Sequence, residues 1–141
     1  MYSSVSSLLI FDILYNIIMA EIKFTIPLAP ITKKNHMQFG RNKYTGKTFV
    51  KQSPAYCQYE KDFIIVCPNI ETIDFGINVK AIYYMPTKQR VDLINLHAAL
   101  HDCLVKKGVL LDDNCNIIIS TDGSRVYYDK ENPRTEVTIS Y

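Results

Sequence analysis

The sequence lacks the patterns that mark several classes of protein. Its four cysteines, Cys57, Cys67, Cys103 and Cys115, are not spaced as CxxC pairs, which argues against a zinc site or a disulfide framework. Their neighbours are apolar, so we expect reduced thiols in the core. Internal repeats and low-complexity segments are also missing, and no apolar run is long enough to cross a bilayer. We therefore expect a cytoplasmic protein that makes no use of a membrane.

Acidic residues are missing from one long stretch of the chain. Residues 22–59 contain no Asp or Glu, whereas the seven basic residues there are Lys23, Lys33, Lys34, Arg41, Lys43, Lys47 and Lys51. The net charge of the whole chain is only +2, so this excess is local. A local positive field attracts phosphate groups.

Length and composition favour one globular domain. The chain has 141 residues, of which 48% are hydrophobic and 21% charged, so it is long enough for a core and is not of the disordered type. Residues 8–18 are apolar but have no basic region before them and no small-residue cleavage site. We expect translation to begin at Met19, which leaves residues 1–18 as a leader and residues 19–141 as the domain. A helix that packs on the domain is the alternative for the leader.

Hydrophobic periodicity and turn residues predict the order of the elements. Helices are expected from Ser53, an N-cap followed by a proline, to Pro68, and from Asp92 to a C-cap at Gly108. Residues 29–52 are expected to form a long basic loop. Strands are predicted at 22–28, 76–84, 116–120, 125–128 and 135–141. This order predicts an α/β fold, a small mixed β-sheet with two helices packed on it.

Acidic side chains flank the second predicted helix. Asp92 stands at its start, and Asp112 with Asp113 follows its end. If the chain folds these carboxylates into one cluster, they suit a hard divalent cation such as Mg²⁺. Each acid also has an ordinary explanation, because Asp92 is a typical helix cap and an Asp pair is typical of a solvated turn.

Two further features of the C-terminal half have more than one interpretation. Asp122 precedes a glycine, which is first of all a turn signal, with a supplementary metal ligand as the alternative and Arg125 as a nearby phosphate contact. His97 and His101 are expected on the exposed side of the second helix, where they contact phosphate, act as a general base or are merely solvated. Ala98 stands where an HExxH motif has its Glu, which argues against zinc.

The predicted basic loop alternates cations with aromatic rings. Its cations are Lys33, Lys34, Arg41, Lys43, Lys47 and Lys51, and its rings are His36, Phe39, Tyr44 and Phe49. Interleaved cations and rings suit a nucleic-acid backbone and unstacked bases. An ordinary solvated loop is the alternative.

From Phe24 onward the chain resembles the RusA-type Holliday-junction resolvases of phages and bacteria. The resemblance is carried by the segments FTIPLAPITKKN, YYMP, DLINLHAALHDCLVKKGVLLDDN and PRTEVTIS. The family has an R-D-L-D-N-L helix start and a downstream L-D-D. The first is matched here by Asp92, Leu93, Asn95 and Leu96, and the second by Leu111, Asp112 and Asp113.

The resemblance implies a RusA-like homodimer that binds four-way DNA junctions. Such enzymes make paired, symmetric nicks with Mg²⁺ held by aspartates, which implies that Asp92 and Asp113 are catalytic metal ligands with Asp112 beside them. Arg90 is near the position of the family's basic residue, although Val91 directly precedes Asp92. We count Arg90 and Arg125 with the loop cations as DNA-binding residues.

Two positions depart from the family pattern. The second family aspartate falls at Ile94, and the family lysine falls at Ala98. Asp122 is the nearest substitute ligand, and His97 or His101 the nearest substitute cation. Three hypotheses follow: a Mg²⁺-dependent endodeoxyribonuclease that resolves Holliday junctions in recombination and repair, a junction-binding protein of the same fold with impaired chemistry, and an interaction protein whose acids are caps and turns.

Overall fold

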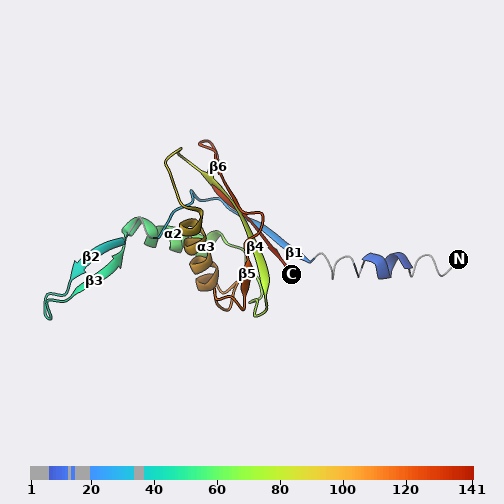
Figure 1. The fold of residues 1–141 in the computed structure, drawn as a ribbon, viewed down its shortest axis with the longest axis horizontal. Coiled ribbons are helices and arrows are strands. Elements are labelled where there is room, and N and C mark those ends of the chain that lie inside the picture. Colours follow the sequence, from blue (N-terminus) through green and yellow to red (C-terminus); the bar gives the residue numbers. More distant parts are fainter. Residues whose placement is uncertain (1–6, 13, 15–19, 34–36) are drawn as a thin grey trace.

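The computed structural model describes residues 7–12, 14, 20–33 and 37–141 (Figure 1). Near the N-terminus, residues 7–12 are helical and the side chains of residues 8–11 are exposed, so the described part of this segment does not pack on the domain. The predicted start at Met19 lies outside the described residues and stays a prediction. Among the described helices, none combines the length and apolar character that a membrane span needs.

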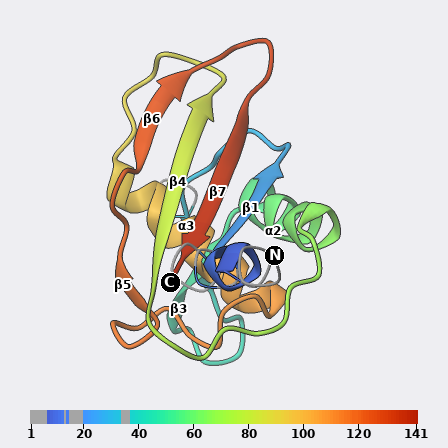
Figure 2. The same cartoon turned by 90° about the vertical axis from the view of Figure 1, so that its right-hand side faces the viewer.

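A mixed five-stranded sheet forms the body of the protein (Figure 2). Strands β1 (Glu21–Ile26), β7 (Arg134–Ser140) and β4 (Ile77–Met85) lie side by side and antiparallel. Strands β5 (Ile118–Ser120) and β6 (Arg125–Tyr128) follow one another along the far edge of β4, both parallel to it. The predicted mixed sheet is confirmed, with all five of its strands.

Two helices cover one face of the sheet, as predicted. Helix α2 (Pro54–Val66) begins after Ser53, whose side-chain oxygen accepts a hydrogen bond from the Tyr56 amide at 3.2 Å. Helix α3 (Leu93–Lys107) ends at Gly108, which has a φ of 86°. This left-handed conformation favours glycine and lets the chain reverse towards the sheet.

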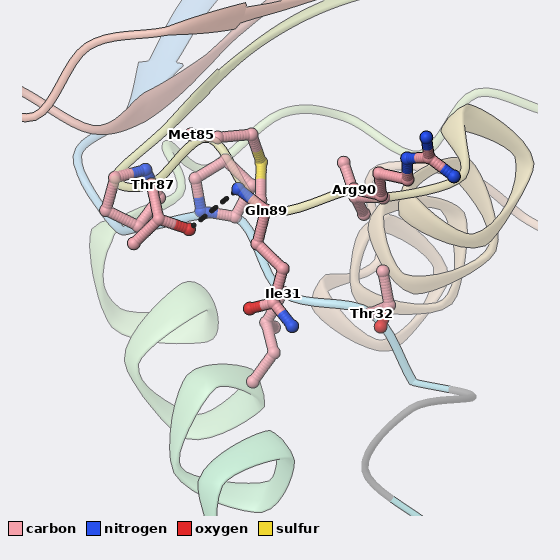
Figure 3. Close-up of a pocket in the computed structure, with 9 residues that line it drawn as sticks. Ile31, Thr32, Met85, Thr87, Gln89 and Arg90 are labelled. Carbon is pink, nitrogen blue, oxygen red and sulfur yellow. Dashed lines mark hydrogen bonds between the residues drawn. The ribbon is translucent and has the colours of Figure 1, made fainter.

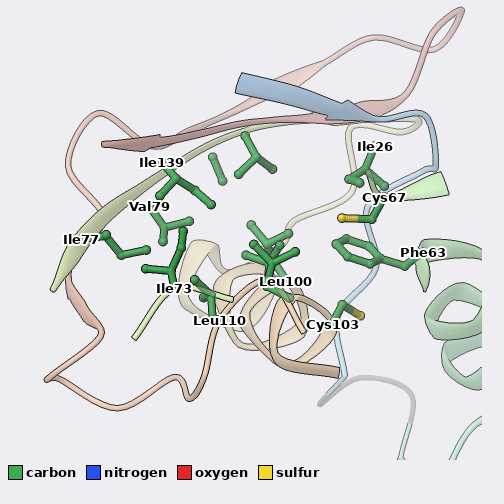
Figure 4. Close-up of a cluster of buried hydrophobic side chains, with 14 of the residues drawn as sticks. Ile26, Phe63, Cys67, Ile73, Ile77, Val79, Leu100, Cys103, Leu110 and Ile139 are labelled. Carbon is green, nitrogen blue, oxygen red and sulfur yellow. The ribbon is translucent and has the colours of Figure 1, made fainter. Parts of the chain in front are cut away.

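The core lies between the sheet and these helices (Figure 4). Alternate residues of β4 point inward, among them Val79 and Ala81, while Leu100 of α3 and Phe63 of α2 fill the space opposite. All four are at most 2% exposed. The other face of the sheet carries polar side chains such as Lys80, so α3 lies against one side of β4 only.

The basic segment is more ordered than the sequence predicts. Strands β2 (Met37–Arg41) and β3 (Thr48–Gln52) pair antiparallel into a hairpin that projects from the body (Figure 1). The Asn42 side chain accepts hydrogen bonds from two amides in the turn, and Gly46 has a φ of 69°. The expectation of an irregular loop over these residues is therefore wrong.

The cysteines divide into two kinds. Cys67 and Cys103 are buried, as expected for core thiols, but Cys57 and Cys115 are exposed, so the expectation is wrong for that second pair. The reason is their position, because Cys57 lies on the outer side of α2 and Cys115 in the loop before β5. All four thiols are free.

Candidate functional site

Asp92 occupies the N-cap position of α3 without capping it through its side chain. Its backbone oxygen accepts hydrogen bonds from the amides of Asn95 and Leu96, but its carboxylate accepts none from the helix backbone. The contact of the carboxylate is with the Asn95 side-chain amide at 3.3 Å. Because Asp92 is also exposed, its carboxylate faces solvent and is accessible to a ligand.

Asp112 and Asp113 lie in an exposed loop between α3 and β5. The Asp112 carboxylate accepts a hydrogen bond from the Asp113 amide at 2.7 Å and another from the Asn114 side chain at 2.9 Å. The first of these bonds is the main reason why the pKa of Asp112 is lowered. Asp112 therefore has the local turn role that the sequence offered as an alternative.

Asp113 differs electrostatically from its neighbour. Partial desolvation is the largest cause of its raised pKa, and the nearby carboxylates of Asp112 and Asp102 raise it further. A group of negative charges around one exposed carboxylate is a place where a bound cation is favoured.

Asp92 and Asp113 lie at opposite ends of α3. The helix contains 15 residues and is therefore about 22 Å long. Asp92 follows the C-terminal end of β4. The loop with Asp112 and Asp113 begins after Leu110, which forms a β-bridge with Ile73, and it leads to β5. Strand β5 pairs with the N-terminal end of β4, so this loop lies near the opposite end of that strand. The chain reversal at Gly108 does not carry this loop back to the beginning of the helix.

Asp122 lies in the turn between β5 and β6. Its amide donates to the Asn78 side-chain oxygen at 2.8 Å, its carbonyl accepts from the Asn78 side-chain amide at 3.2 Å, and Gly123 has a φ of 85°. Asn78 belongs to the face of β4 that points away from α3. The turn interpretation is confirmed, and the role of Asp122 as a metal ligand stays a prediction.

The described part of one chain does not assemble a metal site. Within residues 7–12, 14, 20–33 and 37–141, no three His, Cys, Asp or Glu side chains are grouped so that they fit a metal ion. The expectation that the acids around α3 fold into one cluster is therefore wrong for a single chain, because a rigid helix separates them. The individual roles of Asp92, Asp112 and Asp113 stay predictions.

His97 and His101 are not on the exposed side of α3. The Tyr83 hydroxyl lies 2.8 Å from Nδ1 of His97, and the two imidazole rings stack with their centroids 5.4 Å apart. Burial lowers the pKa of His97, and burial together with His97 lowers that of His101 to about 4. Both rings are then neutral at pH 7, so the expected cation substitute is not provided by either of them.

The predicted DNA-binding cations are spread over several surfaces. The Lys33 ammonium group is paired with Asp102 on α3, while Lys34 and His36 lie outside the described residues. Arg41 donates to the Gly46 carbonyl at 3.0 Å. The hairpin also carries the exposed residues Lys43, Lys47 and Lys51, whose ammonium groups form no ion pair with a described residue, and the exposed rings Phe39, Tyr44 and Phe49.

A small cleft lies next to the start of α3 (Figure 3). It has a volume of about 330 Å³ and runs between residues 30–32, which follow β1, and residues 85–91, which lead from β4 to Asp92. Arg90 lines it and is exposed. The sequence does not reveal this cleft, because its walls come from segments more than fifty residues apart and their contact depends on the sheet order.

A group on the open face of the sheet was also missed. The Arg134 guanidinium lies 3.7 Å from the centre of the Tyr84 ring and forms ion pairs with Asp129 and Glu136. The structure begins β7 at Arg134, one residue before the predicted strand, so Arg134 and Glu136 share one face. The alternation of polar and apolar residues in this segment was the available signal. Arg125 is exposed on β6, two residues before Tyr127, and the Tyr127 ring contacts that of Tyr84. Alternate residues of a strand share one face, so Arg125 lies on the same face as this group.

Comparison with protein-family models gives a match over most of the chain. Residues 27–140 match the family model described as Endodeoxyribonuclease RusA. This range includes both ends of α3, the hairpin and four of the five strands of the sheet. No curated protein matches the chain.

Proposed function

The chain belongs to the RusA family of endodeoxyribonucleases, and from this premise we propose that it is a Mg²⁺-dependent endonuclease that resolves Holliday junctions by paired, symmetric nicks. The family implies a junction-resolving endonuclease, and recombination and repair are the processes that such an activity serves. The observation that carries the proposal is the family match over residues 27–140, together with the exposed carboxylates of Asp92 and Asp113 within it.

The acids at the ends of α3 are the proposed metal-binding residues. Carboxylate oxygens are the ligands that Mg²⁺ prefers, and Asp92 has a carboxylate that is free of helix capping. Asp113 lies among negative charges that favour a bound cation. Asp112 supports the loop that presents Asp113, since it accepts the Asp113 amide.

The β2–β3 hairpin and the cleft at Arg90 are the proposed DNA-binding surfaces. The hairpin presents Lys43, Lys47 and Lys51 without ion-pair partners among the described residues, and cations of this kind bind phosphates. The exposed rings of Phe39 and Tyr44 suit stacking on unpaired bases. Arg90 lies two residues before Asp92, so phosphate held in its cleft is close to a proposed metal ligand.

A homodimer is the proposed assembly. A four-way junction carries pairs of equivalent strands, and two symmetric nicks require two equivalent sites. A twofold dimer is the simplest arrangement that provides them.

Two exposed side chains favour a second candidate, a junction-binding protein with impaired chemistry. Ile94, which stands where the family has an aspartate, is 79% exposed, and Ala98, which stands where it has a lysine, is exposed as well. Neither side chain binds a metal ion or a phosphate. This candidate binds junction DNA in a salt-sensitive manner and does not cut it.

The proposal is tested with the full chain on a labelled synthetic four-way junction and a linear duplex of matched sequence. Each substrate is incubated with Mg²⁺ and, separately, with EDTA. Symmetric nicks in the junction that need Mg²⁺ support the proposed enzyme. Selective binding of the junction without nicks supports the second candidate. If the protein shows no preference for the junction over the linear duplex, the result supports an interaction protein instead.

A further inference from the structure

The open face of the sheet, which points away from α2 and α3, carries side chains that the proposed nuclease function does not use. We infer that this face binds an unpaired nucleic-acid strand, with one base stacked on Tyr127 and phosphates beside Arg125 and Lys80. The inference goes beyond the proposed function and does not depend on it, because this binding needs neither Mg²⁺ nor the acids at the ends of α3.

Tyr127 provides the open ring. It is 49% exposed on β6, at the edge of the described sheet (Figure 2). On its inner side the ring centre lies 5.7 Å from that of Tyr84, and the two ring planes are inclined by 30°. The Arg134 guanidinium covers Tyr84 at 3.7 Å from its centre. The side of Tyr127 that faces away from Tyr84 is therefore the surface that is left for a base.

Tyr84 and Arg134 form a rigid support for this ring. Arg134 forms ion pairs with Asp129 at 3.0 Å and with Glu136 at 3.1 Å, and the Tyr84 hydroxyl donates to Glu136 at 3.5 Å. These contacts fix the guanidinium group over Tyr84 before any ligand arrives. Stacking on a preformed surface costs less conformational entropy than stacking on a mobile ring, so the group suits the binding of bases.

Two cations follow Tyr127 along the same edge of the sheet. Arg125 lies two residues before Tyr127 and therefore points to the same face. Lys80 belongs to β4, and a Cβ atom at Gly123 would lie 3.2 Å from its Cδ atom, so the Lys80 stem crosses the turn that precedes β6. Both cations are exposed and form no ion pair with a described residue. A ring followed by two such cations matches the base and the phosphates of one strand.

The acids nearby leave this edge positive. Asp129 and Glu136 form ion pairs with Arg134, and Asp122 in the turn before β6 opposes part of the charge of the two cations. Lys88 adds a third cation, since its ammonium group lies 5.2 Å from the centre of the ring at the end of β6. A positive edge of this kind attracts the phosphates of a strand.

The face suits an unpaired strand better than a duplex. In a duplex the bases stack on one another and offer no free face to a ring, whereas the bases of a single strand stack on aromatic side chains with little regard to sequence. RNA-recognition domains use a similar arrangement, a sheet with aromatic rings that stack on unpaired bases.

A second cleft connects this face with the start of α3. It has a volume of about 320 Å³ and lies between β6 and the segment that leads to Asp92, with Val91 and Tyr127 among its lining residues. An unpaired strand that leaves DNA bound at Asp92 therefore has a short path to the Tyr127 ring.

A tryptophan reporter tests the stacking directly, because the chain contains no tryptophan. In EDTA, the fluorescence of Tyr127→Trp is expected to be quenched, with saturation, by oligo(dT) of about 12 nucleotides and to change little with an abasic strand of equal length. Quenching by oligo(U) as well extends the site to RNA, and its absence restricts the site to DNA. The matched reporter is Tyr141→Trp, because Tyr141 is 52% exposed at the end of the chain. Equal quenching of both reporters, equal quenching by the abasic strand, or no quenching overturns the inference.

Charge variants of the reporter chain separate this face from the β2–β3 hairpin, which also carries rings. Arg125→Gln with Lys80→Gln is expected to reduce the slope of log K against log salt, measured by the same quenching, by about 1.4, at about 0.7 for each single-strand phosphate contact. The matched control, Lys43→Gln with Lys47→Gln, removes the same charge from the hairpin and is expected to leave the slope unchanged. Equal slopes for the two pairs contradict the inference. Junction cleavage is not part of either readout, so a failure of the proposed nuclease is distinguished from a failure of this site.

Discussion

The Tyr83 hydroxyl lies 2.8 Å from Nδ1 of His97, between β4 and α3. The His97 ring stacks in turn on His101, and the Nε2 atoms of both histidines are buried without a partner among the described residues. This polar group lies on the sheet side of the helix and not among the acids at its ends. The proposed chemistry therefore rests on other residues.

Replacing Tyr83 by Phe is expected to lower the free energy of unfolding by about 1–3 kcal/mol. The substitution keeps the ring but leaves Nδ1 of His97 as a buried atom without a hydrogen bond. Urea unfolding measures the effect. Tyr127→Phe is the matched control, because Tyr127 is 49% exposed and its substitution is expected to change stability by less than about 0.5 kcal/mol. Equal effects of the two variants would show that the hydrogen bond has no role in stability.

The histidines are expected to make stability depend on pH in a defined window. Burial lowers the pKa of His101 to about 4, below its ordinary value of 6.5, so the folded protein favours the neutral ring. The resulting stabilisation is fully present above pH 6.5 and is lost as the pH falls towards 4. Its upper size is about 3 kcal/mol, at about 1.36 kcal/mol for each pKa unit.

Unfolding by urea at pH 7, 5.5 and 4 measures this dependence. The His101→Leu variant has no imidazole to titrate, so we expect its stability to fall less over this range than that of the parent protein. Carboxylates titrate in the same pH window and change the stability of both proteins. The relevant quantity is therefore the difference in the free energy of unfolding between the parent protein and His101→Leu at each pH. Parallel curves for the two proteins would exclude His101 as a source of the pH dependence.

Removing two lysines of the hairpin is expected to weaken junction binding in a salt-dependent way. The double variant Lys43→Ala and Lys47→Ala loses two proposed phosphate contacts, which reduces the slope of log K against log salt by about 1.8. Binding is measured in EDTA over a series of salt concentrations. The control, Lys61→Ala with Lys130→Ala, removes the same charge from exposed residues of α2 and of the loop after β6. If both double variants change the slope equally, the hairpin has no special role.

Local signals in the sequence were sufficient for the elements that build the body. The side chain of Ser53 and the ring of Pro54 define where α2 begins, and the conformational freedom of Gly108 defines where α3 ends. The strands of the sheet have one buried face, so their alternation is visible in the sequence. Each of these features depends on a few neighbouring residues, which is why it was predicted.

The hairpin was not predicted because neither of its faces is buried. Gln38, Phe39 and every residue from Arg41 to Lys51 are exposed, so no alternation of buried and exposed residues marks the described parts of β2 and β3. Its turn at Asn42 depends on side-chain hydrogen bonds, which sequence patterns specify weakly. Basic, polar strands of this kind are easily mistaken for a loop.

The arrangement of the candidate site depends on tertiary structure in the same way. His97 was expected to be exposed because histidine is polar, but its partner Tyr83 comes from a strand and is recognised only once β4 packs on α3. The acids were expected to cluster because they flank one helix, whereas the length of α3 keeps Asp92 and Asp113 apart. Sequence matching therefore identifies the candidate residues, whereas the distance between them follows from the length of α3.

The most direct measurement is the rate of junction cleavage by the Asp92→Asn variant with Mg²⁺, compared with Asp62→Asn. Asp62 lies on α2, where its carboxylate accepts a hydrogen bond from Gln58, far in sequence from the proposed ligands. We predict that Asp92→Asn lowers the rate by at least about 100-fold, or about 2.7 kcal/mol of transition-state stabilisation, and that Asp62→Asn changes it by less than about threefold. Equal cleavage by both variants would contradict the assignment of Asp92 to the nuclease site.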